Sequence, residues 1–223
     1  MDGNGRWATR RGLPRAAGHR AGAEAVRRVV AAAPELGVRA LTLFAFSADN
    51  WKRPPSEVAA LMRLFARHLQ TEAPKLAERG VRLDVVGRRD RLPAPLVASI
   101  AAAERATRDG AELRLRLAVD YSAREAIFRA ACRYYKVTEV SRASFAEVLA
   151  EVNRDGAPDV DLLIRTGGEQ RLSDFLLWES AYAELVFTPR MWPEFSAADL
   201  RAAVEEFHAR ERRFGRLPDA AAS

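Results

Sequence analysis

The sequence is poor in lysine, in cysteine and in long apolar runs. Three lysines stand against 33 arginines, so the net charge of +6 comes almost entirely from guanidinium groups. Cys132 is the only cysteine, which excludes an intramolecular disulfide and fits a reducing cytoplasm. No run of about 18 apolar residues occurs, and no signal peptide precedes Asp2, so we expect a cytoplasmic protein without a membrane span.

Charge and length bound the class of protein. A positive net charge permits an anionic partner, but an arginine bias can also reflect genome composition, and no basic nucleic-acid-binding motif is present. We therefore expect no nucleic acid partner. The 223 residues suit a single domain, and neither a linker nor an internal repeat divides them. The expected domain covers residues 1–215, and the tail 216–223 is expected to be disordered.

The apolar pattern predicts alternating helices and strands. Strands are expected at residues 39–46, 81–86, 113–119, 160–164 and 183–187. Helices are expected at residues 16–36, 56–80, 94–108, 124–135, 145–152 and 197–212, with Ser56 as the N-cap of the longest. This alternation predicts an α/β fold, a single domain with a central, mostly parallel β-sheet flanked by helices.

The first seven residues, MDGNGRW, place a carboxylate, two glycines, an arginine and an aromatic ring in one short turn. The glycines let backbone N–H groups approach an anion closely. Arg6 offers a fork of donors to phosphate oxygens, and Asp2 can bind a hard cation. This composition favours a phosphate and metal site. The alternative is an ordinary turn at the chain end, because Asp-Gly and Asn-Gly are common turn formers.

A second cluster of the same chemistry follows residues 161–164, which read as a buried apolar strand. The strand leads into a Gly-Gly turn with Arg165 before it, Arg171 after it and Ser173 close behind. Open α/β folds bind ligands in loops at strand ends. Two arginines around such a turn can converge on one diphosphate, and a hydroxyl can add a donor. The alternative is a pair of solvated surface arginines.

A third polar loop, residues 47–55, separates a predicted strand from the longest helix. It carries Ser47, Asn50, Trp51 and Arg53, and two prolines stiffen its end. A loop of this composition can fold over a bound ligand. The alternative is an ordinary connection whose tryptophan packs on the core.

Six strings of residues, in order along nearly the whole chain, resemble the cis-prenyltransferase family, most closely its bacterial undecaprenyl diphosphate synthases. They are MDGNGRWA, RxxGHxAG from Arg15, FSxDNWxRP from Phe46, RTGGEQRLSDFLLW from Arg165, AYAEL from Ala181 and RERRFG from Arg210. The resemblance implies a homodimeric, Mg²⁺-dependent α/β enzyme that adds isopentenyl diphosphate units with cis geometry to an allylic diphosphate, commonly farnesyl diphosphate. The paired DDxxD motifs of trans-prenyltransferases are absent.

The resemblance also implies roles for individual residues. Asp2 matches an essential aspartate that binds Mg²⁺ and assists departure of the allylic diphosphate, and Glu184 matches a second metal-associated carboxylate. Asn50 is expected at the catalytic centre as an orienting or relay group, because an amide is a very weak base, and a phosphate oxygen is a candidate base. Substrate-binding residues are expected at Gly3, Asn4, Gly5, Arg6, Trp7, Arg15, His19, Ser47, Ala48, Asp49, Trp51, Arg53, Arg165, Arg171, Leu172 and Ser173.

Within this set, the residues of the first string with Arg15 and His19 resemble the pocket for the allylic diphosphate. The arginines at 165 and 171 with Ser173 resemble the site that binds isopentenyl diphosphate. Glu57 falls with the loop at 47–53, which the family uses to position substrate and coordinate closure. Residues 213–215 (RFG) resemble a tail that completes the diphosphate site, and His68 and His208 are expected to be structural.

The sequence departs from the family pattern at four places. Members usually carry an apolar strand immediately before the DGNGRW segment, with which this sequence begins. Gln170 stands where a histidine is common, which weakens any metal role there. Asp49 replaces a glutamate, and DYSA at residues 120–123 replaces an NYGG turn.

Two residues indicate the length of the product. In the family, a small residue at the position of Ala45 permits a long chain, and a bulky one at that of Leu113 ends it near C55. The longest predicted helix extends roughly 36 Å, enough to line a deep apolar channel. The resemblance thus favours undecaprenyl diphosphate, a cell wall precursor, with peripheral membrane association through this lipid product. The alternatives are a short- or medium-chain synthase and a non-catalytic subunit of the same fold.

Overall fold

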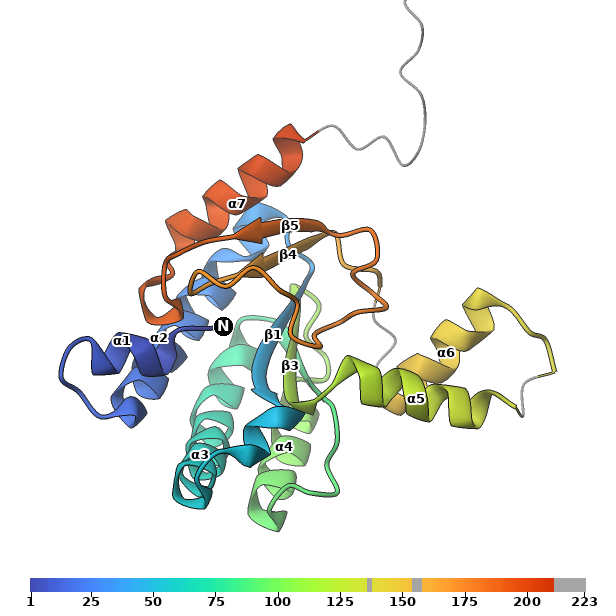
Figure 1. Cartoon of the computed structure of the whole chain (residues 1–223), viewed down its shortest axis with the longest axis horizontal. Coiled ribbons are helices and arrows are strands. Elements are labelled where there is room, and N and C mark those ends of the chain that lie inside the picture. Colours follow the sequence, from blue (N-terminus) through green and yellow to red (C-terminus); the bar gives the residue numbers. More distant parts are fainter. Residues whose placement is uncertain (136–137, 154–157, 211–223) are drawn as a thin grey trace, which may run out of the picture.

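The computed structural model describes residues 1–135, 138–153 and 158–210 (Figure 1). Strands β1 (Ala40–Ser47), β3 (Leu113–Tyr121) and β2 (Val81–Val86) form one parallel sheet in the order β1-β3-β2. Strands β4 (Leu162–Arg165) and β5 (Glu184–Phe187) form a second parallel pair. Parallel neighbours require crossover connections, which helices supply between β1, β2 and β3, whereas turns at residues 166–183 connect β4 to β5. The predicted class, a single α/β domain with a mostly parallel sheet flanked by helices, is confirmed.

Apart from α1, for which no helix was predicted, the helices lie close to their predicted positions. They are α1 (Asn4–Thr9), α2 (Arg15–Ala32), α3 (Pro55–Glu78), α4 (Ala94–Thr107), α5 (Ala123–Tyr134), α6 (Arg142–Asn153) and α7 (Ala197–Ala209), with short 3₁₀ helices η1 (Pro34–Leu36), η2 (Ala48–Lys52) and η3 (Trp192–Glu194). The helix predicted at 197–212 ends earlier than expected, because α7 stops at Ala209 and its C-cap Arg210 has an extended backbone.

The start of α3 differs from the prediction. Its N-cap is Pro54, and Ser56 lies inside the first turn, so the predicted serine cap is wrong. Proline at the first helical position lacks only an N–H group that would have no helical partner there, and its fixed φ suits a helix start. Gly80, with φ 65°, follows the other end, where an L side chain would be strained.

Both faces of the three-stranded sheet are covered. On one face the main core joins the sheet to α2, α3 and α4, with residues such as Val29, Leu61 and Ile100 buried against Leu83 and Leu115. On the other face, the segment around Leu176 and the start of α5 pack on the sheet. The strands differ in pattern, because β1 (ALTLFAFS) is mostly apolar, whereas charged residues alternate with apolar ones in β2 (VRLDVV) and in the first half of β3 (LRLRLAVDY).

The start of the chain lies beside the ends of β1 and β4 (Figure 1). Within the described residues, no strand pairs with the edge of β1 opposite β3 or with the edge of β4 opposite β5. Residues of both strands line the same cavity. The C-terminal ends of the strands, where open α/β folds bind ligands, face the site described next.

Candidate active site

The N-terminal segment forms a helix where a turn was predicted. Gly3 has φ 99°, and α1 begins directly after it at Asn4. This short helix packs into α2 at two glycines. A Cβ atom at Gly18 would lie 1.9 Å from the backbone oxygen of Asn4, and one at Gly22 would lie 2.2 Å from its side-chain oxygen. The helix therefore depends on tertiary packing, which the local sequence does not reveal.

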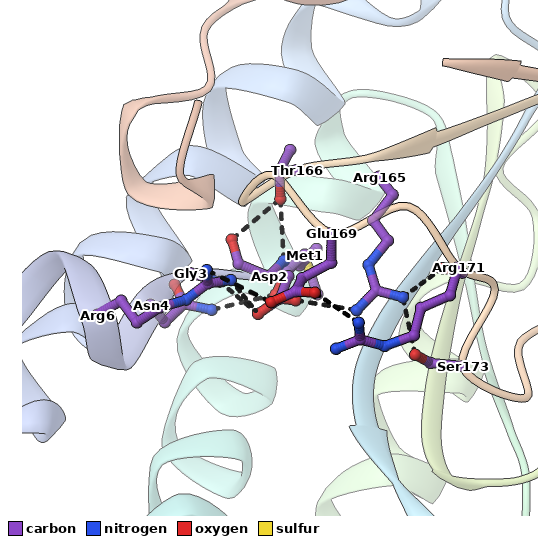
Figure 2. A network of polar contacts seen from close by, with 10 residues as sticks. All are labelled: Met1, Asp2, Gly3, Asn4, Arg6, Arg165, Thr166, Glu169, Arg171 and Ser173. Atoms are coloured by element: carbon purple, nitrogen blue, oxygen red, sulfur yellow. Dashed lines mark hydrogen bonds and ion pairs between the residues drawn. The ribbon is translucent and has the colours of Figure 1, made fainter. Parts of the chain in front are cut away.

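Asp2 lies at the centre of a polar network (Figure 2). Its Oδ2 accepts a hydrogen bond from Arg165 Nη2 at 3.1 Å, and its Oδ1 lies 3.4 Å from Arg6 Nη2. The Gly3 N–H donates to Oδ1 at 2.6 Å. Burial opposes ionisation of Asp2, but these bonds and the two guanidinium charges hold its pKa below the ordinary value. The carboxylate is therefore ionised at neutral pH and presents hard oxygen atoms.

The backbone of Asp2 is held by two further segments. Its N–H donates to Thr166 Oγ1 at 2.9 Å, and the Thr166 hydroxyl donates back to the Asp2 carbonyl at 3.0 Å. The Trp192 N–H donates to the same carbonyl at 2.9 Å. Thr166 is only 2% exposed. Asp2 is thus fixed by the loop after β4 and by η3.

The loop after β4 gathers the two predicted arginines. Arg165 Nη1 donates to Ser173 Oγ at 2.7 Å and also to the carbonyl of Arg171. The turn between them needs glycine, because Gly167 and Gly168 have φ values of 90° and 84°. A Cβ at Gly167 would also lie 2.9 Å from Arg6 Nη2, so this glycine lets the two arginine-bearing segments approach.

Glu169 joins this network, although the sequence analysis did not single it out. It pairs with Arg171 Nη1 at 2.5 Å and lies 3.7 Å from Arg6 Nη1 (Figure 2). An acidic residue between two arginines in RTGGEQR was an available signal. Thr166 had no such signal, because its role depends on a contact with a residue 164 positions away.

A second cluster of basic groups surrounds Glu57 at the start of α3. Arg53 Nη1 donates to Glu57 at 3.1 Å, Arg15 Nε lies 3.5 Å away, and His19 Nε2 lies 3.9 Å away. Burial and the charges of Arg53 and Arg15 lower the pKa of His19 despite the opposing effect of Glu57. A Cβ at Gly5 would lie 2.7 Å from an Arg15 nitrogen, so Gly5 makes room for this guanidinium.

The loop at residues 47–53 is ordered by its own side chains. The Ser47 hydroxyl accepts a hydrogen bond from the Asp49 N–H at 3.1 Å, and Asn50 Oδ1 accepts one from the Ser47 N–H at 3.1 Å. These bonds form a capping box around η2. Because the Asn50 oxygen is engaged by the backbone, the side chain retains its amide N–H groups as donors. Asp49 instead pairs with Lys52 at the surface.

One cavity of about 1110 Å³ connects these segments to the apolar interior. Eleven predicted site residues line it, namely Asp2, Asn4, His19, Ser47, Asp49, Asn50, Arg53, Arg165, Arg171, Leu172 and Ser173. Gly3, Gly5, Arg6, Trp7, Arg15, Ala48 and Trp51 lie behind or beside this lining and do not form part of it. The rest of the wall comes from α2, α3 and the strands, with Ala45, Leu61 and Phe65 among its residues.

Some polar atoms at this rim have no partner. Among the described residues, Asn4 Oδ1, Trp7 Nε1 and His19 Nε2 are buried atoms without a hydrogen bond. Buried polar groups are normally paired, so unpaired ones beside a cationic cavity are consistent with a polar ligand. His68 and His208, predicted to be structural, also line the cavity, whereas Leu113 lies in the core outside its lining.

Glu184 does not lie beside Asp2. It begins β5 and pairs with Leu162, at the end of β4 opposite Arg165, and its carboxylate pairs with Arg210 Nη1 at 2.7 Å. In the described part of the chain, no group of three or more histidine, cysteine or acidic side chains is arranged to hold a metal ion. The predicted RFG tail at 213–215 lies outside the described residues.

A cationic rim above an apolar cavity in a parallel α/β fold is suited to a ligand with an anionic head group and a hydrocarbon tail. The family model described as putative undecaprenyl diphosphate synthase matches residues 1–215. The chain is 59% identical to isoprenyl transferase 1 of Bradyrhizobium diazoefficiens, covering 97% of this chain and 87% of that protein. It is 48% identical to the isoprenyl transferase of Aquifex pyrophilus, covering 98% and 94%.

Solved structures agree. A lavandulyl diphosphate synthase from Lavandula x intermedia, in complex with dimethylallyl diphosphate, matches with a TM-score of 0.90 and 32% identity over 96% of this chain and 95% of that one. A probable undecaprenyl diphosphate synthase from Campylobacter jejuni matches with a TM-score of 0.78 and 34% identity over 87% and 92%. The chain belongs to the cis-prenyltransferase family, as its sequence strings predicted.

Proposed function

We propose that this protein condenses isopentenyl diphosphate with an allylic diphosphate, farnesyl diphosphate being the primer we favour, and extends the chain to undecaprenyl diphosphate. Family membership supports cis-prenyl chain elongation. The observation that carries the finer proposal is the continuity of one cavity from the arginines of the rim to the apolar wall at Ala45. A diphosphate head and a growing hydrocarbon tail need these two environments side by side.

The two basic clusters suit two diphosphates. We assign the allylic diphosphate to the side of the cavity that carries Asn4, His19 and Arg53, with Arg15 behind them. We assign isopentenyl diphosphate to Arg165, Arg171 and Ser173. Guanidinium groups stabilise the charge that develops on a departing diphosphate, and they do so most strongly in a partly buried site. The relative from Lavandula was solved with an allylic diphosphate, which supports a ligand of this class.

The Asp2 carboxylate at the rim, together with phosphate oxygens of a bound substrate, would supply the oxygen ligands that Mg²⁺ prefers. Magnesium is commonly held by one or two carboxylates together with substrate phosphate oxygens, and Asp2 supplies an ionised carboxylate beside the arginines. When bound there, the ion would neutralise diphosphate charge. Glu184 remains a second proposed metal-associated carboxylate, although within one chain it lies at the far end of β5.

The chemistry at the double bond requires loss of a proton after the new carbon–carbon bond forms. Asn50 remains our orienting group, because its oxygen already accepts a backbone hydrogen bond and the residue lines the cavity. A phosphate oxygen of the substrate is the base we favour. His19 serves as a donor to the diphosphate, consistent with its position beside Arg53.

We also propose a homodimer that contacts the membrane through its lipid product. Large apolar side chains, including Phe128 and Tyr182, are exposed on the described surface, a property common at subunit contacts. No helix in the described part of the chain is long and apolar enough to cross a membrane. Light scattering coupled to size-exclusion chromatography measures the oligomeric state, and a monomer at micromolar concentration would refute this part.

The decisive experiment incubates the purified protein with Mg²⁺, farnesyl diphosphate and radiolabelled isopentenyl diphosphate, and sizes the dephosphorylated products by chromatography. We expect long-chain products that reach C55, and none when Mg²⁺ is chelated. Products that stop well short of C55 would favour a short- or medium-chain synthase. No incorporation with any allylic primer would favour a non-catalytic subunit of the same fold.

A further inference from the structure

The two loops that follow β1 and β2 meet at one buried carboxylate, that of Asp120 on the strand β3 between them. Trp51 lies in η2 after β1, Arg91 lies in the turn after β2, and Asp120 lies near the end of β3. Trp51 Nε1 donates to Asp120 Oδ1 at 2.9 Å, and Arg91 Nε donates to Oδ2 at 2.9 Å. The Arg91 Nη2 group also donates to Oδ1. The Asp120 side chain has no exposed surface, so these contacts are shielded from water.

Two residues with left-handed backbone conformations bring the turn after β2 close to the end of β3. Asp120 has φ 51°, a left-handed conformation that is unusual for a residue other than glycine. Gly87 has φ 109°, and a Cβ there would lie 2.3 Å from the carbonyl of Val119. The next residue, Arg88, donates its N–H to the Asp120 carbonyl at 3.2 Å. The turn that carries Arg91 is therefore bound directly to the end of β3.

The indole ring of Trp51 is held on other sides as well. Its centroid lies 5.4 Å from that of Phe46 in an edge-on arrangement, and 5.7 Å from Arg91 Cζ. The same 3₁₀ helix carries Asp49 and Asn50, which line the cavity, and Ser47 directly precedes it. Trp51 thus links this polar loop to Asp120 at the end of β3, in addition to the capping box that orders the loop internally.

We propose that Arg91 and Asp120 are positioning residues that anchor η2 through Trp51. Arg91 contacts both oxygens of Asp120, so the carboxylate keeps its partner when the indole N–H leaves it. The loop is therefore attached by a contact that can be released and remade while the anchor stays intact. The structural part of this inference is independent of the proposed function, but its consequence for substrate binding rests on that function.

The structural part is tested by hydrogen exchange of the backbone amides of residues 47–53 in the full chain. Trp51→Phe keeps an aromatic ring but removes the donor, and it leaves the Arg91–Asp120 pair intact. We expect exchange about tenfold faster in this loop, with α7 unchanged. Trp178→Phe, in the separate cluster beside α5 and α6, is the matched control and should change neither region.

Asp120→Asn keeps the shape of the side chain but weakens the acceptor, and it should also accelerate exchange in residues 47–53. If both residues act through one bond, Asp120→Asn should have no added effect in the Trp51→Phe background. Loop exchange at the wild-type rate in Trp51→Phe, or effects of the two changes that multiply independently, would overturn the proposal. Thermal unfolding of each variant separates a loop effect from loss of the fold.

Steady-state kinetics test the consequence for substrate binding. Trp51→Phe should raise the KM for a diphosphate substrate about tenfold while kcat changes less than about threefold. A fall in kcat at unchanged KM would overturn the positioning role. Absence of prenyl transfer by the wild type would instead refute the proposed function, and the exchange experiment would still decide whether the anchor exists.

Discussion

The Asp2 network and the Glu57 cluster face the same cavity but distribute their charges differently. In the first, Arg165 has its own acceptors, with bonds to Asp2, to Ser173 and to a backbone carbonyl. In the second, Arg15, Arg53 and His19 all face the single carboxylate of Glu57. Loss of one acceptor therefore leaves Arg165 positioned, whereas loss of Glu57 would release three groups together.

The two regions also differ in rigidity. Arg165 is 13% exposed, and it projects from a strand end next to a turn in which Gly167 and Gly168 have left-handed backbones. Arg15 is 50% exposed and lies in the first turn of a helix. Exposure varies within each cluster, since Arg171 is 62% exposed and His19 16%, but Arg165 is held by several acceptors and Arg15 by one carboxylate. We call the side of the cavity with Arg165 the fixed side and the side with Arg15 the adjustable side. We expect the fixed side to govern chemistry and the adjustable side to govern primer choice.

The largest effect is expected at Asp2. Asp2→Ala should lower kcat by at least about 10²–10³-fold, the size of effect seen when one preorganised electrostatic group is removed. Diphosphate binding, measured by calorimetry, should change little because the arginines stay in place. Asp90→Ala, which removes an exposed carboxylate outside the cavity, is the control. A variant that keeps a large fraction of wild-type turnover with Mg²⁺ would contradict the role assigned to Asp2.

The two arginines of the fixed side come next. Arg165→Ala or Arg171→Ala should raise the KM for isopentenyl diphosphate about 10- to 150-fold, because each loses a charge-assisted contact of about 1.5–3 kcal/mol. The KM for farnesyl diphosphate should change much less. Arg108→Ala, at an exposed arginine away from the cavity, is the control. Equal effects on both substrates would show that the two clusters are assigned to the wrong diphosphates.

The apolar wall shared by both clusters is tested at Ala45. Ala45→Leu adds volume to a packed wall, at a cost of about 1–3 kcal/mol of strain. Later condensations are affected because the longer chain must pass this residue, whereas the short chain of the early condensations does not reach it. Products shorter than C55 should therefore accumulate, while the first condensation keeps nearly its original rate. Ala59→Leu, on the exposed side of α3, is the volume-matched control. An unchanged distribution of dephosphorylated products from a stable variant would show that Ala45 does not control the length of the product.

The smallest effect is expected in the pH dependence of the free energy of unfolding, through His19 of the adjustable cluster. The pKa of His19 in the folded protein lies below 6.5, so the unfolded chain binds its proton first as the pH falls. Stability from neutral His19 is therefore complete above pH 6.5 and is lost on acidification below it. His19→Gln should flatten the fall in the free energy of unfolding between pH 7.5 and 5, measured by urea titration. An identical slope in both proteins would mean that His19 does not contribute.

Much of the fold could be predicted because β-branched and other apolar residues recur along each strand, in alternation with charged ones in β2 and β3. The strand at 81–86 was predicted at its observed limits, and the helix at 94–108 ends within one residue of the observed one. The predicted turn at residues 1–7 was wrong because α1 forms only against Gly18 and Gly22 of α2. A periodic pattern cannot report a helix of that length.

The structure brings eleven of the predicted site residues to one cavity, but the sequence did not specify the contacts among them. The arginines and glycines around residue 167 predict an anion site by composition, and their binding role stays a prediction. The pairing of Asp2 with Thr166, or of Trp51 with Asp120, depends on how distant segments meet, and no spacing along the chain encodes it. Glu184 is the opposite case: it was predicted as a second metal-associated carboxylate, but its position at the start of β5 places it away from Asp2.

The two glycines of α2 have a consequence for how this protein can be altered. Gly18 and Gly22 leave no clearance for a methyl group beneath α1, so the depth at which α1 rests is set by bare backbone. Asp2 is joined to that helix by Gly3 and by its ion pair with Arg6, so a shift of α1 would also disturb Asp2. A mutagenesis library aimed at new primers should therefore leave Gly18 and Gly22 unchanged, because a larger residue at either position would displace α1.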